Sequence, residues 1–263
     1  MLAGGEILSR NTQEPQFRVY CMSSSIEYLL STYPRPRPPL SERHEALYLA
    51  EYSRNRGGKS GLSAVVAHLE AWMHRRVATG GPGRRIMELG AGTLNHVPYE
   101  TNFSVYDVVE PFRELWESSP YRQRVTSIHL DVSEIPSKAS YDQIISIAVL
   151  EHLTELPRTV AKCALLLNEG GEFRAGIPTE GGLLWGLAWR MTTGISFRLR
   201  TGLSYKAIMR HEHLNQSDEI LSIMRYLFRS VEFSRFPFPA KHVSFYTVLR
   251  ARNPHLDRCA SLL

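Results

Sequence analysis

The sequence predicts an α/β fold built around a mostly parallel β-sheet. Its 263 residues, 43% hydrophobic and 22% charged, have the size and composition of a globular protein with one large core. From residue 84 onward, short apolar runs alternate with helical patterns, which is typical of parallel strands joined by right-handed crossovers. Gly90 and Gly92 directly follow the first apolar run and indicate a loop whose backbone a ligand can approach closely.

Seven segments have the pattern of β-strands. The first five are separated by helical patterns, of which residues 156–167 give the clearest. The last two are joined by the sequence PFPAK, which permits a hairpin and therefore an antiparallel edge on the sheet. The seven segments are residues 86–89, 104–109, 125–130, 143–148, 172–176, 230–236 and 243–249.

Residues 1–80 are expected to form an N-terminal extension and helical lid. An apolar stretch at 26–30 predicts a short helix. The sequence YPRPRPPL at 33–40 must be extended, because proline fixes its own φ and disfavours a helical conformation in the residue before it. Two helical patterns follow, one from Ser41 and one over residues 63–77.

The rest of the chain divides into a larger domain at 81–252 and a C-terminal tail at 253–263. Residues 179–215 form a helical insertion within this domain, between the fifth strand and the last helix. Ligands of open α/β sheets bind at the carboxyl ends of the strands, so we expect the insertion on the substrate side.

The sequence has no signal for membrane insertion or secretion. No apolar run approaches the roughly 20 residues of a membrane-spanning helix, and the first residues lack the basic and apolar regions of a secretory signal. The cysteines Cys21, Cys163 and Cys259 are too far apart in sequence for a metal or redox motif. We therefore expect reduced thiols and a cytoplasmic protein. The net charge of +5 favours an anionic partner or serves only solubility.

The two-glycine loop differs from that of dinucleotide-binding proteins. Their G-x-G-x-x-G pattern would place a third glycine at position 95, where this chain has Asn95. Glu88, at the end of the preceding strand, would repel a pyrophosphate. A cofactor with a cationic end and no phosphate fits this acid better, and S-adenosylmethionine has such an end, with an ammonium and a sulfonium.

The sequence ELGAG at 88–92 resembles motif I of the class I S-adenosylmethionine-dependent methyltransferases, which have a Rossmann-like fold. Four further segments resemble later strands and turns of this family and occur in the family's order. The ordered set is more specific than any one member, because a two-glycine loop alone occurs in many proteins. The four segments are residues 106–111, 130–132, 141–153 and 167–173.

Two departures from the family's pattern lie just after motif I. Thr93 and Leu94 stand where the family has its third glycine. Only a short segment, interrupted by Pro98, separates the loop from the second strand. The first crossover helix must therefore be truncated.

The resemblance implies S-adenosylmethionine as the cofactor and assigns most of its contacts to strand ends. Gly90, Ala91 and Gly92 would expose backbone to the cofactor, and Glu88 would lie near its methionine ammonium. Glu110 would accept two hydrogen bonds from the ribose. It stands 20 positions after Gly90 (110 − 90), the spacing at which an acid meets ribose hydroxyls in related folds.

Later strand ends would complete the cofactor site. Pro111 follows the ribose acid, and Asp131 with the Val132 amide would bind the adenine. Ala148 and Val149 would line the cofactor beside the reacting centre. The alternative for each acid is a solvated strand end.

The N-terminal extension contributes one more expected cofactor contact. Tyr52, with its helical neighbours Tyr48 and Arg56, would close on the methionine end. Packing of these aromatic side chains against the sheet is the alternative.

Three histidines are candidates for catalysis. Methyl transfer from a sulfonium depends mainly on alignment, and a base is needed only if the acceptor arrives protonated. His152, just after the fourth strand, is the first candidate, with helix capping as its alternative role. His211 and His213 are alternative bases. They are two apart and have no third ligand close in sequence, so no metal site is expected.

The insertion is expected to select the methyl acceptor. Trp185 and Trp189 are four apart and would share a helical face. Arg198 and Arg200 suit a phosphate or carboxylate, because a guanidinium binds these groups in a bidentate way. An anionic small molecule is therefore expected, such as a nucleotide-linked sugar, a lipid-linked intermediate or a carboxylated metabolite. A helical lid with a solvated basic face is the alternative.

Other functions are less consistent with the sequence. Enzymes of this fold that methylate base amino groups usually carry Asn/Asp-Pro-Pro-aromatic after the fourth strand, whereas this chain has AVLEHL at 148–153. This difference argues against a nucleic-acid partner and favours the small-molecule branch of the family. A nucleic-acid methyltransferase, a non-catalytic adaptor with the same fold and an NAD oxidoreductase remain the alternatives.

Overall fold

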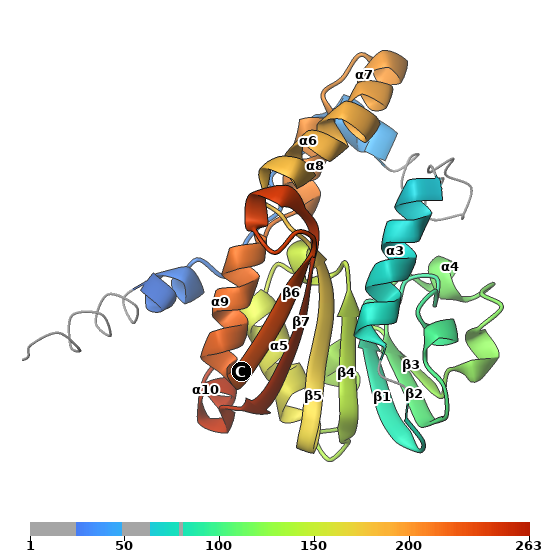
Figure 1. The fold of residues 1–263 in the computed structure, drawn as a ribbon, viewed down its shortest axis with the longest axis vertical. Coiled ribbons are helices and arrows are strands. Elements are labelled where there is room, and N and C mark those ends of the chain that lie inside the picture. Colours follow the sequence, from blue (N-terminus) through green and yellow to red (C-terminus); the bar gives the residue numbers. More distant parts are fainter. Residues whose placement is uncertain (1–24, 49–63, 79–80) are drawn as a thin grey trace, which may run out of the picture.

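A computed structural model describes residues 25–48, 64–78 and 81–263 of the chain. Its centre is a seven-stranded sheet with the order β3-β2-β1-β4-β5-β7-β6 (Figure 1). Strands β1 to β5 are parallel, and β7 runs antiparallel to β5 and β6, so the predicted sheet with its edge hairpin is confirmed. The strands are β1 (Arg84–Leu89), β2 (Phe103–Val109), β3 (Ser127–His129), β4 (Tyr141–Ile147), β5 (Leu167–Pro178), β6 (Phe228–Pro237) and β7 (Ser244–Pro254).

All seven strands differ from their expected bounds, and the fifth, expected at 172–176, and the seventh, expected at 243–249, are several residues longer. Two strands end earlier than expected. The third, expected at 125–130, is limited to Ser127–His129, because the amide of Val125 closes a 3-10 turn and the amide of Leu130 donates to the Glu134 carboxylate. The fourth ends at Ile147, since Ala148 has a φ of +53° and turns the chain out of the sheet. Both differences arise from turns at the strand ends.

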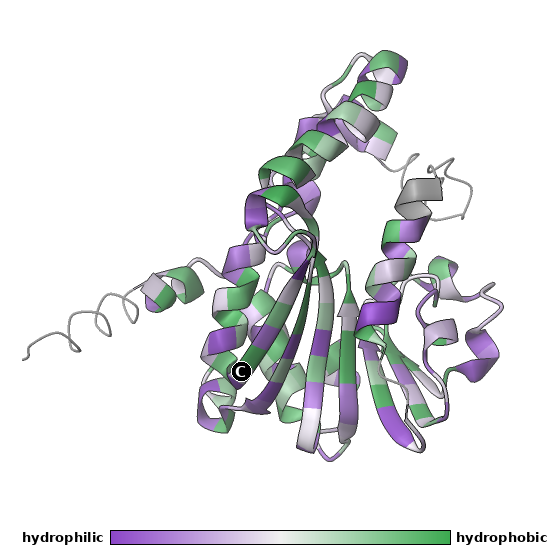
Figure 2. Cartoon of the chain, in the orientation of Figure 1, coloured by the Kyte–Doolittle hydropathy of each residue, from purple (hydrophilic) through white to green (hydrophobic). Residues whose placement is uncertain are grey.

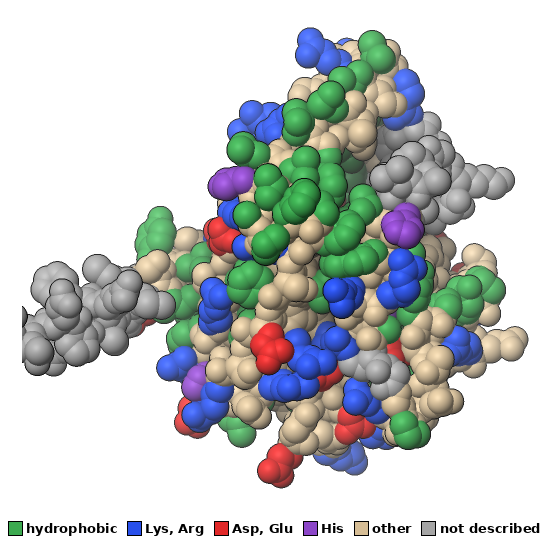
Figure 3. All heavy atoms as spheres, viewed as in Figure 1, with side chains coloured by type: hydrophobic (Ala, Val, Ile, Leu, Met, Phe, Trp, Pro, Cys, Tyr) green, Lys and Arg blue, Asp and Glu red, His purple; other side chains and the backbone are tan. Residues whose placement is uncertain are grey.

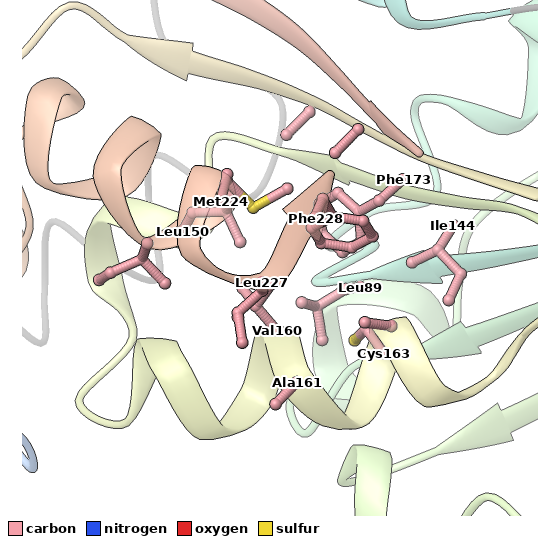
Figure 4. Packing of buried hydrophobic residues seen from close by; sticks show 14 of the residues in the cluster. Leu89, Ile144, Leu150, Val160, Ala161, Cys163, Phe173, Met224, Leu227 and Phe228 are labelled. Carbon is pink, nitrogen blue, oxygen red and sulfur yellow. The ribbon is translucent and has the colours of Figure 1, made fainter. Parts of the chain in front are cut away.

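The sheet has a hydrophobic core on each face, because successive side chains of a strand point to opposite faces. Met87 and Ile144 pack under α5 (Leu156–Leu165) and α9 (Ser217–Leu227), whereas their neighbours Ile86 and Ile145 pack under α3 (Ala64–Val77). Figure 4 shows the first core, in which Phe173 of β5 lies beside Phe228 of β6, with ring centroids 6.2 Å apart. Figure 2 shows hydrophobic residues in green along the strands of the sheet.

Helix α3 packs directly on the sheet. A Cβ added at Gly176 of β5 would lie 2.4 Å from Cγ of Met73, and both Met73 and Val77 are buried. Although it belongs to the segment expected as a lid, α3 is thus part of the layer that covers β4, β5 and β7.

The truncation of the first crossover is confirmed. Between β1 and β2 the only helical residues are the single 3-10 turn Val97–Tyr99, with Pro98 in its first turn. Leu94 and Val97 fill the space with fully buried side chains. The rings of His96 and Tyr99 stack with His74 of α3 at 5.2 and 5.0 Å from its centroid.

The N-terminal extension crosses the molecule as an extended strap. Residues 25–31 are helical and residues 33–40 have no regular secondary structure, as predicted, and residues 42–48 are helical again. The Arg35 guanidinium makes a bidentate pair with Glu219 at 2.8 and 2.9 Å. It also donates to the Leu214 carbonyl, so the strap is tied to the start of α9.

One helix directly precedes the β6–β7 pair in the chain, and another follows it. The expected tail completes β7 and forms α10 (Leu256–Ala260), whose Cys259 is buried against α5 and α9. Cys163 and Cys259 are free thiols, and burial raises the pKa of Cys163 to about 12. Helix α9 begins after Gln216, which forms a reciprocal capping box with Glu219. Gln216 is therefore the N-cap of this helix.

The insertion after β5 is helical, as predicted, and extends beyond the carboxyl edge of the sheet (Figure 1). We call its helices the arm: α6 (Leu183–Trp189), a π-helical segment (Arg190–Gly194), α7 (Ile195–Thr201) and α8 (Tyr205–Glu212).

We expect Arg35→Ala to lower the free energy of unfolding by about 1–3 kcal/mol, because it removes charge-assisted hydrogen bonds from partly buried groups. Denaturant unfolding of both proteins measures this change. Arg113→Ala, which removes the solvent-exposed pair with Glu117, is the control and should leave the unfolding midpoint unchanged. Equal midpoints for Arg35→Ala and the control would contradict a structural role of the strap.

Candidate active site

The loops after β1, β2, β3 and β4 meet at one edge of the sheet. Leu89 pairs with Val109 on one side and with Ser146 on the other, and Val109 pairs with His129, so the four strands end at one level. The strand order reverses between β1 and β4, and ligands of open α/β sheets bind at such a reversal.

The two-glycine loop has the conformation that only glycine adopts readily. Gly90 has a φ of +72° and Gly92 a φ of +51°. A Cβ at Gly90 would lie 2.3 Å from Cγ2 of Val149, so the loop after β1 and the loop after β4 are in direct contact. Ala91 is buried between the glycines, and Ala148 is exposed beside them.

The carboxylate of Glu110 connects the end of β2 to this loop. The Gly92 amide donates to one oxygen at 2.8 Å and the Phe112 amide donates to the other at 3.1 Å. Glu110 is only 5% exposed. Each carboxylate oxygen retains a lone pair after these bonds, so Glu110 can accept further hydrogen bonds.

Glu88 lies beneath the loop and is buried. The Tyr106 hydroxyl donates to its Oε2 at 2.6 Å. Burial raises the pKa of Glu88 to about 7, against the opposing effects of His96 and the Tyr106 hydroxyl, and Glu100 and Glu110 add to the rise. A cation placed nearby would favour its ionised form.

The end of β3 carries an exposed acid next to a buried apolar residue. The Ser133 hydroxyl and amide both donate to Asp131, and the hydroxyl bond is the main reason for its lowered pKa. Val132 is buried, whereas Leu130 is 54% exposed. Pro111 and Phe112 are exposed at the neighbouring end of β2, so apolar surface surrounds this edge.

A second group of polar side chains gathers where the arm returns to the sheet. His152 Nδ1 lies 2.8 Å from the carbonyl of Glu212. Because a carbonyl only accepts, Nδ1 carries the proton and the lone pair of neutral His152 is on Nε2. The side chain is 29% exposed, so Nε2 is the nitrogen available to another molecule.

His213 lies against His152, with ring centroids 4.8 Å apart. Its Nδ1 is 2.6 Å from Oε1 of Glu180, a close ion pair whose angle is poor for a hydrogen bond. Burial acts to lower the pKa of His213, but Glu180, Glu151 and Glu212 together raise it above its ordinary value. The Trp185 indole donates to the same Glu180 oxygen at 2.5 Å and fixes the first turn of the arm.

Glu151 completes this group. It is 1% exposed, burial raises its pKa, and its Oε2 has no hydrogen-bond partner in the described part of the chain. We call Glu151, His152, Glu180, Glu212 and His213 the acceptor-side cluster. Its members come from the β4 exit loop, the end of β5 and the end of the arm.

Other residues expected at the site lie elsewhere. His211 faces the strap, with Nδ1 2.8 Å from the Pro38 carbonyl and its ring 5.5 Å from that of Tyr48. Arg198 and Arg200 are exposed on α7, at the outer end of the arm (Figure 1). Tyr52 lies outside the described residues.

The N-terminal extension contacts the acceptor-side cluster through Tyr48, whose hydroxyl donates to Glu212. Arg56 lies outside the described residues. Among residues 25–48, 64–78 and 81–263, no group of three His, Cys, Asp or Glu side chains is arranged to hold a metal ion.

The sequence analysis missed three acids of the cluster: Glu151, Glu180 and Glu212. Glu180 follows the carboxyl end of β5 and could have been found by the argument that selected Glu110 and Asp131. Glu212 was considered only as part of a metal pattern. Its position beside His152, 60 residues away, depends on the path of the arm.

Comparison with known proteins finds a methyltransferase domain in the chain. Residues 87–175 match the protein family described as Methyltransferase domain. A S-adenosylmethionine-dependent methyltransferase from Thermotoga maritima, a possible histamine N-methyltransferase, has a similar structure with a TM-score of 0.51. The two sequences are 17% identical, and the similarity covers 69% of this chain and 86% of that one.

Two further structures are similar. An O-methyltransferase family protein from Burkholderia thailandensis has a TM-score of 0.50 and 12% identity, covering 91% of this chain and 70% of that one. Phosphoethanolamine N-methyltransferase 2 of Haemonchus contortus, solved with S-adenosyl-L-methionine, has a TM-score of 0.49 and 12% identity, covering 72% and 53% respectively. A search among curated protein sequences gives no match.

The fold, the loop geometry and the family match agree. Residues 87–175 form a methyltransferase domain, and the sheet has the fold of the class I S-adenosylmethionine-dependent methyltransferases, whose cofactor is S-adenosylmethionine. The resemblance of its sequence motifs to this family is thereby confirmed.

We expect Glu180→Gln to lower the pKa of His213, because it removes the adjacent negative charge while keeping an oxygen that can accept from Trp185. NMR titration of the histidine ring protons measures the shift. In the unmodified protein the raised pKa contributes stability that is fully present below the unfolded value of 6.5 and is lost as the pH rises through the folded pKa. Glu232→Gln, at an exposed position on β6, is the control, and equal His213 titrations in both variants would contradict the ion pair.

Proposed function

We propose that the enzyme transfers the methyl group of S-adenosylmethionine to a small, anionic acceptor that binds between the β4 exit loop and the first turn of the arm. The acceptor-side cluster carries this proposal, because it gathers a half-buried histidine and an unpartnered carboxylate oxygen next to the loop at Ala148 and Val149. Buried polar atoms without partners are rare unless a ligand or water completes them.

The strand ends would hold the cofactor in the roles that the family resemblance implies. Gly92 fits this role, since a Cβ there would meet nothing within 4 Å, whereas a Cβ at Gly90 would collide with Val149. Glu110 would accept from the ribose hydroxyls while it keeps its bonds to the two amides. Glu88, whose pKa of about 7 allows ionisation near neutral pH, would balance the methionine ammonium.

The adenine would bind at the edge formed by β2 and β3. Asp131 is exposed and ionised, so it can accept from the amino group, and the Val132 amide follows it directly. Pro111 and Phe112 would cover one side of the ring and Leu130 the other. Burying these exposed apolar surfaces would add to the binding energy.

Methyl transfer needs alignment before it needs a base. The bound cofactor supplies an electrophilic methyl group on a sulfonium, and the chain must hold the acceptor in line with it. Nε2 of His152 would accept a proton from an acceptor hydroxyl or ammonium. The Glu212 carbonyl fixes the tautomer, and His213 with its ion pair would limit rotation of the ring. His211 faces the strap and is a weaker candidate.

The class of acceptor is inferred from the arm. Trp185 lies at its first turn, next to the cluster, and Arg198 and Arg200 supply positive charge farther out. Because these arginines lie away from the cluster, they suit an acceptor long enough to reach both, such as a nucleotide-linked sugar or a lipid-linked intermediate whose anionic group lies far from the methylated atom. The free thiols Cys163 and Cys259 are consistent with a cytoplasmic location.

Transfer of a labelled methyl group tests the acceptor class. The enzyme is incubated with labelled S-adenosylmethionine and a cell extract divided into small-molecule, lipid and nucleic-acid fractions. We expect label in a product of low molecular mass or in a lipid that carries an anionic group. Label confined to the nucleic acids would contradict the proposal and favour a nucleic-acid methyltransferase. If calorimetry detects no binding of S-adenosylmethionine, the result would favour a non-catalytic adaptor.

We expect Glu110→Ala to weaken binding of S-adenosylhomocysteine by about 10- to 100-fold, because a hydrogen bond to a charged group contributes about 1.5–3 kcal/mol. Isothermal titration calorimetry measures this loss. Glu110→Gln keeps one acceptor oxygen and should lose less. Glu114→Ala, at an exposed position on α4 (Arg113–Trp116), is the control. Unchanged affinity in Glu110→Ala would overturn the ribose role.

We expect His152→Asn to reduce the turnover rate by about 10²- to 10⁴-fold with little change in cofactor affinity, if the acceptor arrives protonated. Initial rates in the active extract fraction, measured as a function of pH, should lose the rise that reflects deprotonation of the base. His242→Ala, at an exposed position near the end of β6, is the control. Equal rates and pH profiles would exclude His152 as the base.

A further inference from the structure

The arm presents a continuous apolar stripe to solvent. Five side chains spaced four residues apart point outward from α6, the π-helical segment and α7, and each is more than half exposed. Figure 3 shows these hydrophobic side chains as a band along the arm. Isolated exposed leucines are common, but a regular row of them is not. The stripe consists of Leu183, Leu187, Met191, Ile195 and Leu199.

The π-helical segment keeps the stripe on one side. In an α-helix with 3.6 residues per turn, a spacing of four exceeds one turn, so the side chains would gradually wind around the axis. The segment Arg190–Gly194 has the wider turn of a π-helix, in which a spacing of four falls short of one turn. The two deviations oppose each other near Met191, so the row winds around the arm less than it would on a continuous α-helix.

The opposite side of the arm already has packing partners within the chain. Phe197 is 1% exposed, with its ring 5.3 Å from that of Tyr205, and the Trp189 ring lies 6.2 Å from Tyr205. Ile208 is buried, and Trp185 packs against Tyr246 of β7. The stripe is therefore the free face of a helix whose other face is satisfied.

The arm is strongly basic. Residues 181–211 contain no aspartate or glutamate. Figure 3 shows basic side chains on both sides of the apolar band. Five cationic side chains of this segment are exposed: Arg190, Arg198, Arg200, Lys206 and Arg210.

The apolar surface continues from the arm to the end of the β6–β7 hairpin. Phe238 is 58% exposed and Val243 is 44% exposed, and the turn Lys241–Val243 packs against α6. Among the described residues, no helix is long and apolar enough to cross a membrane. The apolar surface therefore suits partial insertion and not a membrane span.

We propose that the arm docks on the surface of a lipid bilayer with anionic headgroups. The stripe and Phe238 enter the boundary between headgroups and acyl chains, and the arginines and lysine contact the phosphates. An amphipathic helix with a basic polar side and leucine on the other binds such interfaces. A second copy of the chain is a poorer partner, because two basic arms would repel each other.

This inference is independent of the identity of the methyl acceptor. Docking would place the outer end of the arm at the membrane, whereas the cofactor loop lies at the sheet edge below the arm (Figure 1). If the unmodified protein binds the cofactor but does not bind vesicles, only the docking proposal is therefore contradicted.

Co-sedimentation of the full chain with vesicles tests the proposal. We expect binding to vesicles of phosphatidylcholine with about 30% phosphatidylglycerol, and weaker binding to pure phosphatidylcholine or at high salt. Leu187→Gln/Leu199→Gln should lower the partition coefficient at least about tenfold, because glutamine lacks the favourable free energy of transferring a leucine side chain out of water. Arg198→Gln/Arg200→Gln should lower the partition coefficient about fivefold per residue, and only on anionic vesicles.

A matched control separates the arm from general surface apolarity. Leu256→Gln alters a leucine that is 58% exposed on α10, at the opposite end of the molecule, and should bind vesicles as the unmodified protein does (Figure 1). Circular dichroism checks that all variants fold. Equal binding of Leu187→Gln/Leu199→Gln and Leu256→Gln would overturn the proposal. The proposal would also be overturned if the unmodified protein did not bind vesicles but formed a dimer in analytical ultracentrifugation, and if Leu187→Gln/Leu199→Gln did not form that dimer.

Discussion

The site depends on the alignment of the strand ends around β1. The pairing of Leu89 with both Val109 and Ser146 brings the loops after β1, β2 and β4 to one level, although they are far apart in sequence. The contact of Gly90 with Val149 and the bond from Gly92 to Glu110 then hold these loops together. A shift of any one strand by a residue would separate the groups that meet at this edge of the sheet.

The fold could be predicted from the sequence because its signals are local. Alternating strand and helix patterns define a parallel sheet, and the ordered motifs from Glu88 onward define its family. The missing helix after β1 was also predictable, since Pro98 and the short distance to β2 leave no room for one. Turns caused the errors: the positive φ of Ala148 and the side-chain bond of Glu134 depend on the neighbouring structure.

The acceptor side could be predicted only in part. His152 and His213 were recognised as candidates because of their positions near strand ends and helix ends. Their contact, and the roles of Glu180 and Glu212, depend on a helical arm that leaves the sheet and returns beside it. No pattern in the sequence gives the direction of that path. Arg198 and Arg200, chosen for their chemistry, lie on the part of the arm farthest from the sheet in Figure 1.

The arm also begins and ends at neighbouring points. The Ser217 hydroxyl donates to the carbonyl of Glu180 at 3.0 Å, so the residues just after β5 lie next to the first turn of α9. Because its two ends lie next to each other, the arm can be exchanged with little disturbance of the rest of the fold. The chain can therefore be divided at these two points into a sheet that stays constant and an arm that can be replaced, and chimaeras joined there would retain the scaffold.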